Sequence, residues 1–512
     1  MTDAPDGGAA TDPYEPRPGL TSREADWSGL RVVVAGLGIS GFAAADALIE
    51  RGAHVTVVDA ATEGKVLSDR AQILRMLDAQ VLLGPEHVQR LPTSVLGAGG
   101  AAGPVELVVT SPGWRPDAPL LADAAAAGVP VWGEVELAWR MRPARGAAPW
   151  VTLTGTNGKT TTVGMVTSIL RAGGLRAVAA GNVGTPIMEA VLDPTGYDVI
   201  AVELSSFQLH WQRSLAPLAS ACLNVAPDHL TWHGSLEAYV ADKARVFENT
   251  QVACVYNVQD PRTEQMVRDA DVQEGCRAIG FTLDVPRVGM VGLVDDVLAD
   301  RAFVAERQTS AAELGTLTDL RVGTRDPAPH YVANALAAAA LARACGVSPG
   351  AVRDGLRAFR PDAHRIAEVA TADGVTWIDD SKATNPHAAA ASLASFDHVV
   401  WIAGGQLKGS DVDELVAAAA TRLRGAILLG VDRAQIAQAL ARHAPQVPVV
   451  DLERTDTGVM EDVVAHAARL ARPGDVVLLA PAAASLDMFA DYTVRGESFA
   501  AAVRRHFGGD AA

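Results

Sequence analysis

The stretch TGTNGKTT at residues 154–161 is a candidate phosphate-binding loop, because its GKT ending matches a P-loop. It departs from the full GxxxxGKT spacing, since position 153 is leucine and the first glycine is Gly155. A shortened loop can still direct backbone N–H groups at phosphates, bring the Lys159 ammonium near the β- and γ-oxygens and offer the Thr160 hydroxyl to Mg²⁺. The pattern predicts ATP binding, and a glycine-rich turn with a solvated lysine is the structural alternative.

A second glycine-rich turn, GLGISG at residues 36–41, matches the GxGxxG fingerprint between an expected strand and an expected helix. Asp59 ends the next expected strand, where an acidic residue belongs in that fingerprint. The glycines permit a tight turn, and the helix N-terminus supplies oriented N–H groups for a phosphate. Taken alone, the motif is compatible with NAD(P), with another phosphorylated ligand or with a purely structural turn.

Two phosphate-binding loops in separate domains suit a nucleotide phosphoryl donor and a phosphorylated acceptor, which favours group transfer over redox chemistry. Glu203 ends the apolar run VIAVEL and is either a Mg²⁺ ligand, a water-positioning carboxylate or a surface acid. Asp228 and His229 follow the strand-like CLNVAP, where the histidine contacts a metal or phosphate or is an ordinary loop residue. Lys243, in EAYVADKARVF, has the pattern of a solvated helix lysine.

Polar residues follow three expected strands near the C-terminus. The segment DSKATN at residues 380–385 combines a cation with hydroxyl groups after a buried strand, which suits a small anionic substrate. Lys408 and Ser485 follow two further strands. The three strand ends can converge on one ligand, although each segment taken singly is equally compatible with an ordinary polar loop.

The elements that must position these residues are short apolar strands alternating with amphipathic helices. Strands are expected at 31–36, 54–59, 106–110, 150–155 and 198–206, and helices at 42–51 and 332–344. Residues 280–325 are expected to be irregular because glycine interrupts their pattern. Beyond residue 362 strands and helices alternate throughout, which implies a mostly parallel, doubly wound sheet with right-handed crossovers.

These elements predict an α/β chain with three domains. The polar, Pro/Gly-rich residues 1–28 are expected to be a disordered tail. A Rossmann-like N-terminal domain at 29–146 is expected to end at the linker RPARGAAP, and a P-loop-type central ATPase domain at 147–361 to end at Pro361. A doubly wound, Rossmann-like domain is expected at 362–512.

Composition limits the function classes for this chain of 512 residues. The formal charge of −17 repels polyanions, which argues against nucleic-acid binding. The four cysteines form no CxxC pair and fit a reducing cytoplasm. No apolar run reaches the roughly 18 residues of a membrane span, so a soluble protein is expected.

Taken together, the motifs GTNGKTTT, ELSSFQL, NVAPDHLTWHG, ADKARVFEN, HYVANALAA, DDSKATN and PAAASLDMF resemble the Mur ligases, which build the peptidoglycan stem peptide. The resemblance runs in the family's order from about residue 30 to near the C-terminus, and DSKATN is typical of the members that add D-glutamate. Folylpolyglutamate synthases resemble only the middle and parts of the end. With this resemblance, the loop at 36–41 is expected to be a uridine-diphosphate cradle rather than an NAD site.

The resemblance implies ATP-dependent amide synthesis. The L-alanyl carboxylate of UDP-N-acetylmuramoyl-L-alanine would attack the γ-phosphate of ATP, and the D-glutamate amine would displace phosphate from the acyl phosphate. It also implies two Mg²⁺ ions, a carbamylated Lys243, a monomeric state, and no nucleic-acid or membrane partner.

The family's motifs also assign roles to individual residues. The catalytic residues would be Lys159, His229 and Lys243, and the metal ligands Thr160, Glu203, His229 and Lys243. ATP would contact Gly155, Thr156, Asn157, Gly158, Lys159, Thr160, Thr161, Asn334, Arg365 and Asp380. The UDP-linked substrate would contact Gly38, Ile39, Ser40, Asp59, Asn182, Ser205 and Gln208. D-glutamate would contact Lys382, Thr384, Lys408, Ser485 and Tyr492.

Three alternatives remain at this point. The chain could be a sister or folylpolyglutamate-type ligase, with the same ATP chemistry and another substrate. It could be an NAD-dependent oxidoreductase that uses the loop at 36–41. A binding-only protein would require a degenerate catalytic set, yet Lys159, Glu203, His229 and Lys243 are all present.

Overall fold

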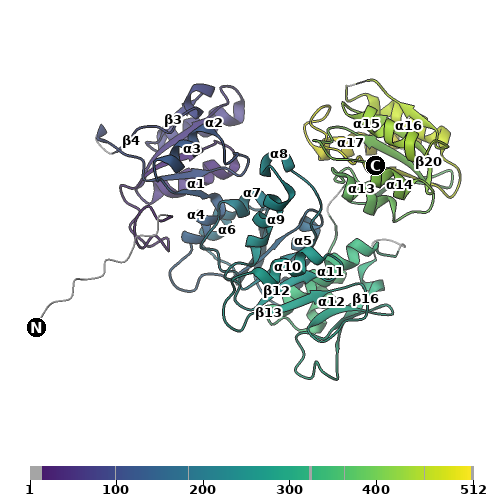
Figure 1. Cartoon of the computed structure of the whole chain (residues 1–512), viewed down its shortest axis with the longest axis horizontal. Coiled ribbons are helices and arrows are strands. Elements are labelled where there is room, and N and C mark those ends of the chain that lie inside the picture. Colours follow the sequence, from purple (N-terminus) through teal and green to yellow (C-terminus); the bar gives the residue numbers. More distant parts are fainter. Residues whose placement is uncertain are drawn as a thin grey trace, which may run out of the picture. The chain divides into compact units, whose positions relative to one another are not determined.

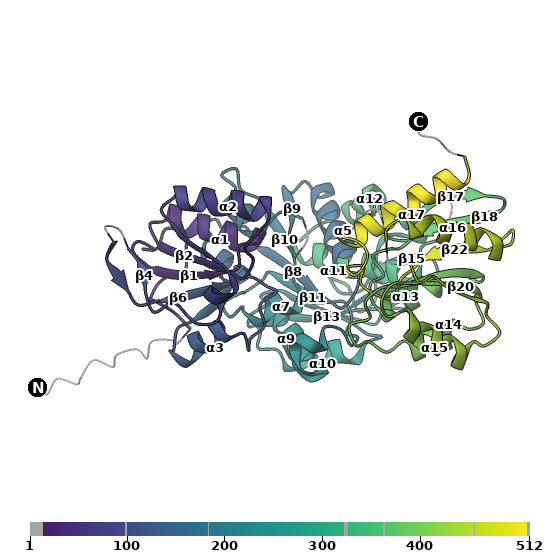
Figure 2. The same cartoon turned by 90° about the horizontal axis from the view of Figure 1, so that it is seen from above.

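The structure is a computed structural model that describes residues 14–97, 100–182, 184–321, 326–361, 364–454 and 456–508. The chain divides into two compact units: Met1–Val225, Val240–Leu320 and Ala333–Phe359 form the first, and Ala226–Tyr239, Arg321–Val332 and Arg360–Ala512 the second. The first unit holds an N-terminal and a middle sheet, and the second unit a C-terminal sheet (Figures 1 and 2). The predicted three-domain α/β organisation is therefore present. The boundary at 146/147 stays a prediction, and residue 362 lies outside the described residues.

The N-terminal sheet is parallel and has the strand order β3-β2-β1-β6-β7. Its strands are β1 (Arg31–Ala35), β2 (His54–Asp59), β3 (Gln80–Leu83), β6 (Leu107–Thr110) and β7 (Val131–Gly133). Its helices are α1 (Ile39–Glu50), α2 (Lys65–Met76), α3 (Pro119–Ala126) and α4 (Glu134–Arg140). Valines on both faces of β1 and β6 are buried, as expected for a parallel sheet between helices. A hairpin of β4 (Val95–Leu96) and β5 (Ala102–Gly103) interrupts the pattern.

The predicted disordered tail does not hold for residues 14–28. Leu20 and Trp27 are buried, and the Arg17 guanidinium donates two hydrogen bonds of 2.9 Å to the Glu106 carboxylate. The polar, Pro/Gly-rich composition hid this packing, because a few apolar anchors are enough to hold an irregular segment on a domain. Residues 1–13 of the expected tail lie outside the described residues.

The middle sheet has the strand order β16-β15-β14-β13-β12-β11-β8-β10-β9. Its strands are β8 (Trp150–Thr154), β9 (Ala177–Gly181), β10 (Val199–Glu203), β11 (Ala219–Cys222), β12 (Ala253–Asn257), β13 (Arg277–Phe281), β14 (Met290–Val294), β15 (Val297–Asp300) and β16 (Ala312–Thr316). Its helices include α5 (Lys159–Ala172), α6 (Ile187–Leu192), α7 (Ser206–His210), α9 (Leu236–Ala244), α10 (Pro261–Asp269), α11 (Pro329–Ala344) and α12 (Pro349–Ala358).

The expectation of an irregular region at 280–325 is wrong where β14, β15 and β16 form, at 290–294, 297–300 and 312–316. Strands β14, β15 and β16 pair there in antiparallel fashion and extend the otherwise parallel middle sheet. The turn between β14 and β15 contains Asp295 with a positive φ of 53°, which aspartate tolerates in a tight hairpin. Residues 322–325 lie outside the described residues.

The C-terminal sheet has the strand order β17-β18-β22-β19-β20-β21 and is parallel except for β17. Its strands are β17 (Ala367–Ala372), β18 (Val375–Asp379), β19 (Val399–Gly404), β20 (Leu423–Leu429), β21 (Val449–Asp451) and β22 (Val476–Leu479). Helices α13 (Pro386–Leu393), α14 (Asp413–Ala419) and α15 (Arg433–His443) pack on one face. Helices α16 (Val459–Leu470) and α17 (Tyr492–His506) pack on the other, which confirms the doubly wound arrangement.

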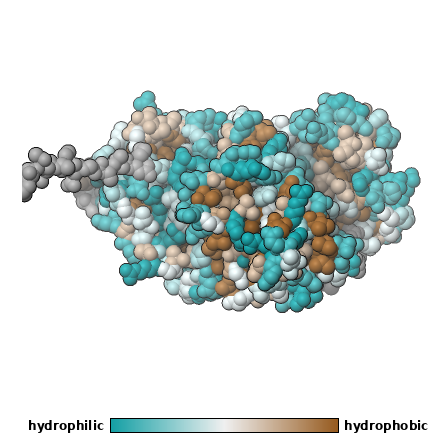
Figure 3. Space-filling model, turned by 60° about the horizontal axis from the view of Figure 1, so that its bottom comes forward, coloured by the Kyte–Doolittle hydropathy of each residue, from teal (hydrophilic) through white to brown (hydrophobic). Residues whose placement is uncertain are grey.

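Within the described part of the chain, no helix has the length and apolar character needed to cross a membrane. On the face shown in Figure 3, hydrophilic side chains surround smaller hydrophobic patches.

Candidate active site

The first glycine loop connects β1 to α1 in the N-terminal sheet. Gly36 has a φ of 101°, and a Cβ on Gly41 would overlap the Gly36 carbonyl oxygen. Both positions therefore require glycine, one for its backbone conformation and one for close packing. Gly38 precedes the first turn of α1 and has open space where a Cβ would stand, and Ile39 beside it is exposed. The amino end of α1 is thus open to an anion.

Two carboxyl groups lie beside this loop. The Asp59 carboxylate accepts hydrogen bonds from the Leu37 amide at 2.7 Å and from the Ala61 amide at 2.9 Å. The second carboxyl group belongs to Glu134, which accepts a hydrogen bond from the Ser40 hydroxyl. Burial of the Glu134 side chain raises its pKa. Asp59 therefore anchors the backbone of the loop from β2.

The second glycine loop connects β8 to α5 in the middle sheet. Asn224 fixes it: its Oδ1 accepts from the Asn157 amide at 2.9 Å, and its Nδ2 donates to the Asn157 carbonyl at 3.1 Å. Gly158 is left-handed with a φ of 85°, and a Cβ there would overlap the Asn334 side chain. The structure therefore places Asn334 of α11 directly against the loop.

Two lysines converge on the carbonyl oxygen of Gly155. The Lys159 ammonium donates to it at 2.9 Å and to the Thr156 carbonyl at 3.0 Å. The Lys243 ammonium donates to the same Gly155 oxygen at 2.9 Å and contacts the Thr154 hydroxyl at 3.3 Å. Lys243 is only 2% exposed, so its interpretation as a solvated helix lysine is wrong. Burying an ammonium is costly, which marks this position as a functional candidate.

Glu203 stands on the strand next to this loop. Strand β10 pairs in parallel with β8, and Glu203 lies opposite Leu153 at the end where the loop begins. Its side chain is 1% exposed, and Oε1 accepts from Asn182 Nδ2 at 2.9 Å. Oε2 is buried without a hydrogen-bond partner among the described residues. The surface-acid interpretation is therefore wrong, and a cation is the natural partner for this oxygen.

Three residues expected at the UDP-linked substrate have partners in the first unit. Asn182 bonds to Glu203, as above. Ser205 and Gln208 form a capping box at the start of α7: the Gln208 amide donates to Ser205 Oγ at 3.2 Å, and the Ser205 amide donates to Gln208 Oε1 at 2.9 Å. These contacts fix the amino end of α7, which leaves the two side chains little rotational freedom.

His229 belongs to the second unit, in the segment that leads into α8 (Leu230–His233). Its backbone is left-handed with a φ of 53°, and Asp228 accepts a hydrogen bond of 2.8 Å from its amide. Non-glycine residues in this conformation are strained and recur at functional positions. Its ring Nε2 lies 3.6 Å from an Asp228 oxygen.

Asp380 begins the polar loop after β18 in the second unit. Burial raises its pKa to about 7, against the opposing effects of a hydrogen bond from Ser392 Oγ and one from the Ile366 amide. His364 and Ile366, on either side of Arg365, both have positive φ. The His364 ring lies 2.5 Å from Asp379, so the Arg365 segment is held against the same loop.

The polar loop continues to Lys382, whose ammonium lies over the Tyr492 ring at 5.0 Å from the centroid. Ser381 Oγ donates to the Tyr492 carbonyl at 2.7 Å. Arg495, which is 1% exposed, donates to Ser381 Oγ at 3.0 Å and to its carbonyl oxygen at 2.8 Å. The start of α17 is thus fixed against the loop that contains Lys382.

Backbone bonds join the three strand ends that the sequence singled out. The Ala482 amide donates to the Ala383 carbonyl at 2.9 Å, next to Thr384. Gln406 and Ala484 exchange two backbone hydrogen bonds. Gln406 lies two residues before Lys408, and Ala484 directly precedes Ser485. The loops after β18, β19 and β22 therefore meet at one edge of the sheet, as predicted.

Comparisons with known proteins cover nearly the whole chain. Residues 30–133 match the MurD-like N-terminal domain of Mur ligases, residues 153–342 the Mur ligase middle domain and residues 364–483 the glutamate ligase domain of Mur ligases. A UDP-N-acetylmuramoylalanine–D-glutamate ligase of Streptomyces avermitilis is 60% identical over 94% of this chain and 99% of its own length. The same-named proteins of Thermobifida fusca and Mycolicibacterium smegmatis are 57% and 46% identical, over 93% and 94% of this chain and 98% and 97% of their own lengths.

This chain belongs to the Mur ligase family.

Solved structures agree with the fold of this Mur ligase. A Thermotoga maritima MurF ligase in complex with ADP has a TM-score of 0.54 at 16% identity and covers 96% of this chain and 99% of its own. The UDP-N-acetylmuramate–alanine ligase MurC of the same organism has a TM-score of 0.52 at 19% identity, with 94% and 100% covered. At these identities the likeness concerns the fold alone.

Two residues of this Mur ligase that shape the site escaped the sequence analysis. Asn224 pins the nucleotide loop from the segment after β11, and Arg495 ties α17 to the loop after β18. Asn224 begins the motif NVAPDHLTWHG but was assigned no role there, and Arg495 belongs to no motif, because each acts on a backbone segment distant in the sequence. The NVAPDH stretch held a weak signal for Asn224, since it follows a strand next to β8.

Proposed function

We propose that this Mur ligase joins D-glutamate to UDP-N-acetylmuramoyl-L-alanine and consumes ATP. The supporting observation is the convergence of Lys159 and Lys243 on one carbonyl of a glycine loop, next to a strand that ends at the buried Glu203. Such a site combines backbone amides that bind phosphate, cations that neutralise its charge and a carboxylate that can bind a metal ion. These are the groups that phosphoryl transfer requires. The names and full-length identity of the relatives support the choice of substrates.

The carboxylate of the L-alanyl group is a poor electrophile for an amine, because its leaving group would be oxide. The L-alanyl carboxylate attacks the γ-phosphorus of ATP, which forms an acyl phosphate and releases ADP. The neutral amine of D-glutamate then adds to the acyl carbon, and the tetrahedral intermediate expels phosphate. Lys159 would neutralise charge on the transferring phosphoryl group, once its ammonium turns from the loop carbonyls to the phosphate. The ATP cradle would comprise Gly155, Thr156, Asn157, Gly158, Thr160, Thr161, Asn334, Arg365 and Asp380.

The residues fit Mg²⁺. Glu203 Oε2 is buried and lacks a hydrogen-bond partner among the described residues, and Thr160 lies in the first turn of α5. Across the described ranges, no group of three or more His, Cys, Asp or Glu residues forms a metal cluster. The proposed ligands therefore combine protein groups with phosphate oxygens, as Mg²⁺ commonly does. Thr160 and Glu203 would hold one ion and His229 and Lys243 a second, and bound Mg²⁺ would neutralise phosphate charge.

Lys243 would act as a carbamate. The ammonium first loses a proton, and the neutral amine then adds to CO₂, forms an N–C bond and releases a second proton, which leaves an anionic oxygen ligand in place of a buried cation. Its burial beside Gly155 is consistent with a group held for a ligand rather than for solvent.

The two substrates would bind to different sets of loops, the UDP-linked substrate near the first glycine loop and α7, and D-glutamate at the strand-end loops of the C-terminal sheet. The UDP-linked substrate would contact Gly38, Ile39, Ser40, Asp59, Asn182, Ser205 and Gln208. D-glutamate would contact Lys382, Thr384, Lys408, Ser485 and Tyr492. Arg495 donates to Ser381 and to the Ala483 carbonyl, which holds two of their loops in place. We place the reaction in the cytoplasm and expect a monomer, which light scattering would check.

Phosphate release tests the proposal. The assay contains ATP, Mg²⁺, UDP-N-acetylmuramoyl-L-alanine and D-glutamate, with each omitted in turn and L-glutamate as a control. Release that requires all four components and prefers D-glutamate is expected. Release with another amino acid or acceptor would assign a sister activity. Absence of release with every combination would contradict ligase activity.

A further inference from the structure

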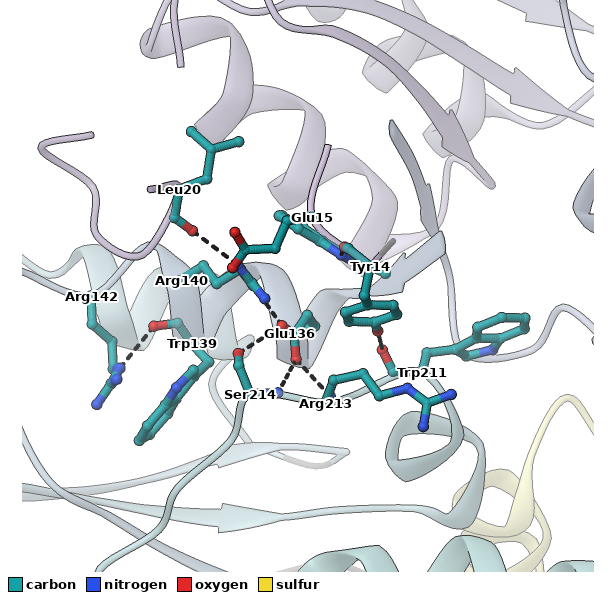
Figure 4. A network of polar contacts seen from close by, with 11 residues as sticks. Tyr14, Glu15, Leu20, Glu136, Trp139, Arg140, Arg142, Trp211, Arg213 and Ser214 are labelled. Carbon is teal, nitrogen blue, oxygen red and sulfur yellow. Dashed lines mark hydrogen bonds and ion pairs between the residues drawn. The ribbon is translucent and has the colours of Figure 1, made fainter. Parts of the chain in front are cut away.

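The N-terminal segment Tyr14–Leu20 contacts both domains of the first unit (Figure 4). The Tyr14 hydroxyl donates to the Trp211 carbonyl of the middle domain at 2.7 Å. The indole N–H of Trp132, on β7 of the N-terminal domain, donates to the Tyr14 carbonyl at 2.9 Å. Tyr14 therefore bridges the two domains through its side chain and its backbone.

A buried carboxylate joins the same two domains beside Tyr14. Glu136 of α4 has a fully buried side chain and accepts from the Arg213 amide at 2.7 Å and the Ser214 amide at 2.9 Å (Figure 4). It also accepts from Ser214 Oγ and from Arg140 Nε, each at 2.6 Å. Residues 213–214 come just after α7, so α4 holds the chain at the carboxyl end of that helix.

Arg140 connects this carboxylate to the N-terminal segment. Its guanidinium donates to Glu15 at 3.1 Å and to the Leu20 carbonyl at 3.3 Å. Arg140 is almost completely buried, and burial is offset by its two carboxylate partners. Residues 14–20 thus close over α4 and are held at both ends.

Residues that flank Lys243 of the nucleotide site contact His210 of α7. Arg245 directly follows α9, which contains Lys243, and its guanidinium donates to the His210 carbonyl at 2.5 Å. The Asp242 carboxylate lies 2.9 Å from the His210 ring. Helix α7 is therefore held by Tyr14 through Trp211 and by the residues on either side of Lys243.

We infer that residues 14–20 form a strap that positions α7, with Tyr14 as a positioning residue for the UDP-linked substrate. Tyr14 would act through Trp211 on the helix whose amino end carries Ser205 and Gln208. Burial and the Glu136 charge raise the pKa of the Tyr14 phenol, so it remains a hydrogen-bond donor across neutral pH. The inference rests on the proposed function only for the assignment of Ser205 and Gln208 to that substrate.

Tyr14→Phe in the full chain tests the strap, because it removes one hydroxyl and keeps the ring. The KM for UDP-N-acetylmuramoyl-L-alanine is expected to rise about 3- to 10-fold, the factor for one net hydrogen bond. The kcat and the KM values for ATP and D-glutamate are expected to stay within about 2-fold, since α7 carries none of their proposed contacts. Tyr197→Phe is the matched control, because its hydroxyl donates to Asp193 on the same surface segment and neither residue is a proposed substrate contact.

Hydrogen exchange separates a failure of the strap from a failure of the proposed function. Amides of residues 205–214 are expected to exchange several-fold faster in Tyr14→Phe than in Tyr197→Phe, whether or not the enzyme ligates D-glutamate. A chain lacking residues 1–20 should show the larger effect in both measurements. Unchanged exchange at 205–214 together with an unchanged KM would overturn the strap. Equal rises in all three KM values would also overturn it, because they would indicate general destabilisation.

Discussion

The two glycine loops of this Mur ligase have the same strand–loop–helix form but different surroundings. In the first, the Asp59 carboxylate is occupied by two backbone amides, and the space around Gly38 is open. In the second, two ammonium groups meet at the Gly155 carbonyl, and the neighbouring strand ends at the buried Glu203. The turn itself therefore provides only backbone amides that bind a phosphate. The neighbouring strands and helices determine whether a phosphoryl group can also be transferred there.

Lys243→Ala should have the largest effect on activity, and this effect should be confined to the second loop. Ligation is expected to fall by about 10³-fold or more, because charge in the transition state loses its stabilisation. Affinity for the UDP-linked substrate should stay nearly unchanged, since the first loop does not contain this lysine. Phosphate release and calorimetric binding check both parts. A small added carboxylate should partly restore activity, and full activity in the variant would contradict a metal-ligand role.

Glu203→Gln should have the next largest effect. Loss of the charge on the unpartnered oxygen should lower kcat by about 10²-fold and raise the Mg²⁺ concentration needed for half-maximal rate. Glu189→Gln is the control, because Glu189 is an exposed acid on α6 of the same domain. A Mg²⁺ titration of phosphate release compares the two variants. Equal Mg²⁺ requirements would contradict the assignment of Glu203.

A pair of alanine variants sharpens the account of the first loop. Gly38→Ala has open space and should keep its melting temperature, yet raise the KM for the UDP-linked substrate about 10-fold if phosphate approaches there. Gly41→Ala meets the Gly36 carbonyl and should cost about 2 kcal/mol of stability. Thermal unfolding and steady-state kinetics separate the two effects. An unchanged KM in Gly38→Ala would argue against a phosphate at this helix end.

Asp59→Asn should have the smallest effect. The amide keeps one acceptor oxygen and loses the other, so one backbone bond at Leu37 or Ala61 weakens. Stability is expected to fall by about 1 kcal/mol, with a change of only a few-fold in the KM for the UDP-linked substrate. Denaturant unfolding measures the first value. A loss comparable to that of Lys243→Ala would mean that Asp59 takes part in the chemistry.

The sequence predicts the parallel α/β parts of the fold well. Strand β2 has the predicted bounds, because a strong hydrophobic period coincides there with clear turn residues. The antiparallel strands β14–β16 and the packing of residues 14–28 escaped prediction. Both depend on partners distant in the sequence, which override a composition typical of loops.

The candidate site divides in the same way. Glycine spacing and strand ends predict where the loops lie, and the structure brings the loops of Lys382, Lys408 and Ser485 to one sheet edge. Burial could not be predicted from spacing, so Lys243 had the pattern of a surface lysine until the family resemblance was considered. Asn224 and Arg495 act on the backbone of remote segments, so the sequence assigned a role to neither of them.

Calorimetric binding to Lys159→Ala and Gly38→Ala tests most directly the claim that the two loops serve different ligands. Each variant is titrated with a non-hydrolysable ATP analogue and, separately, with UDP-N-acetylmuramoyl-L-alanine. We predict that Lys159→Ala loses affinity for the ATP analogue alone, and that Gly38→Ala loses affinity for the UDP-linked substrate alone. Loss of the same ligand in both variants would contradict the division of labour between the loops.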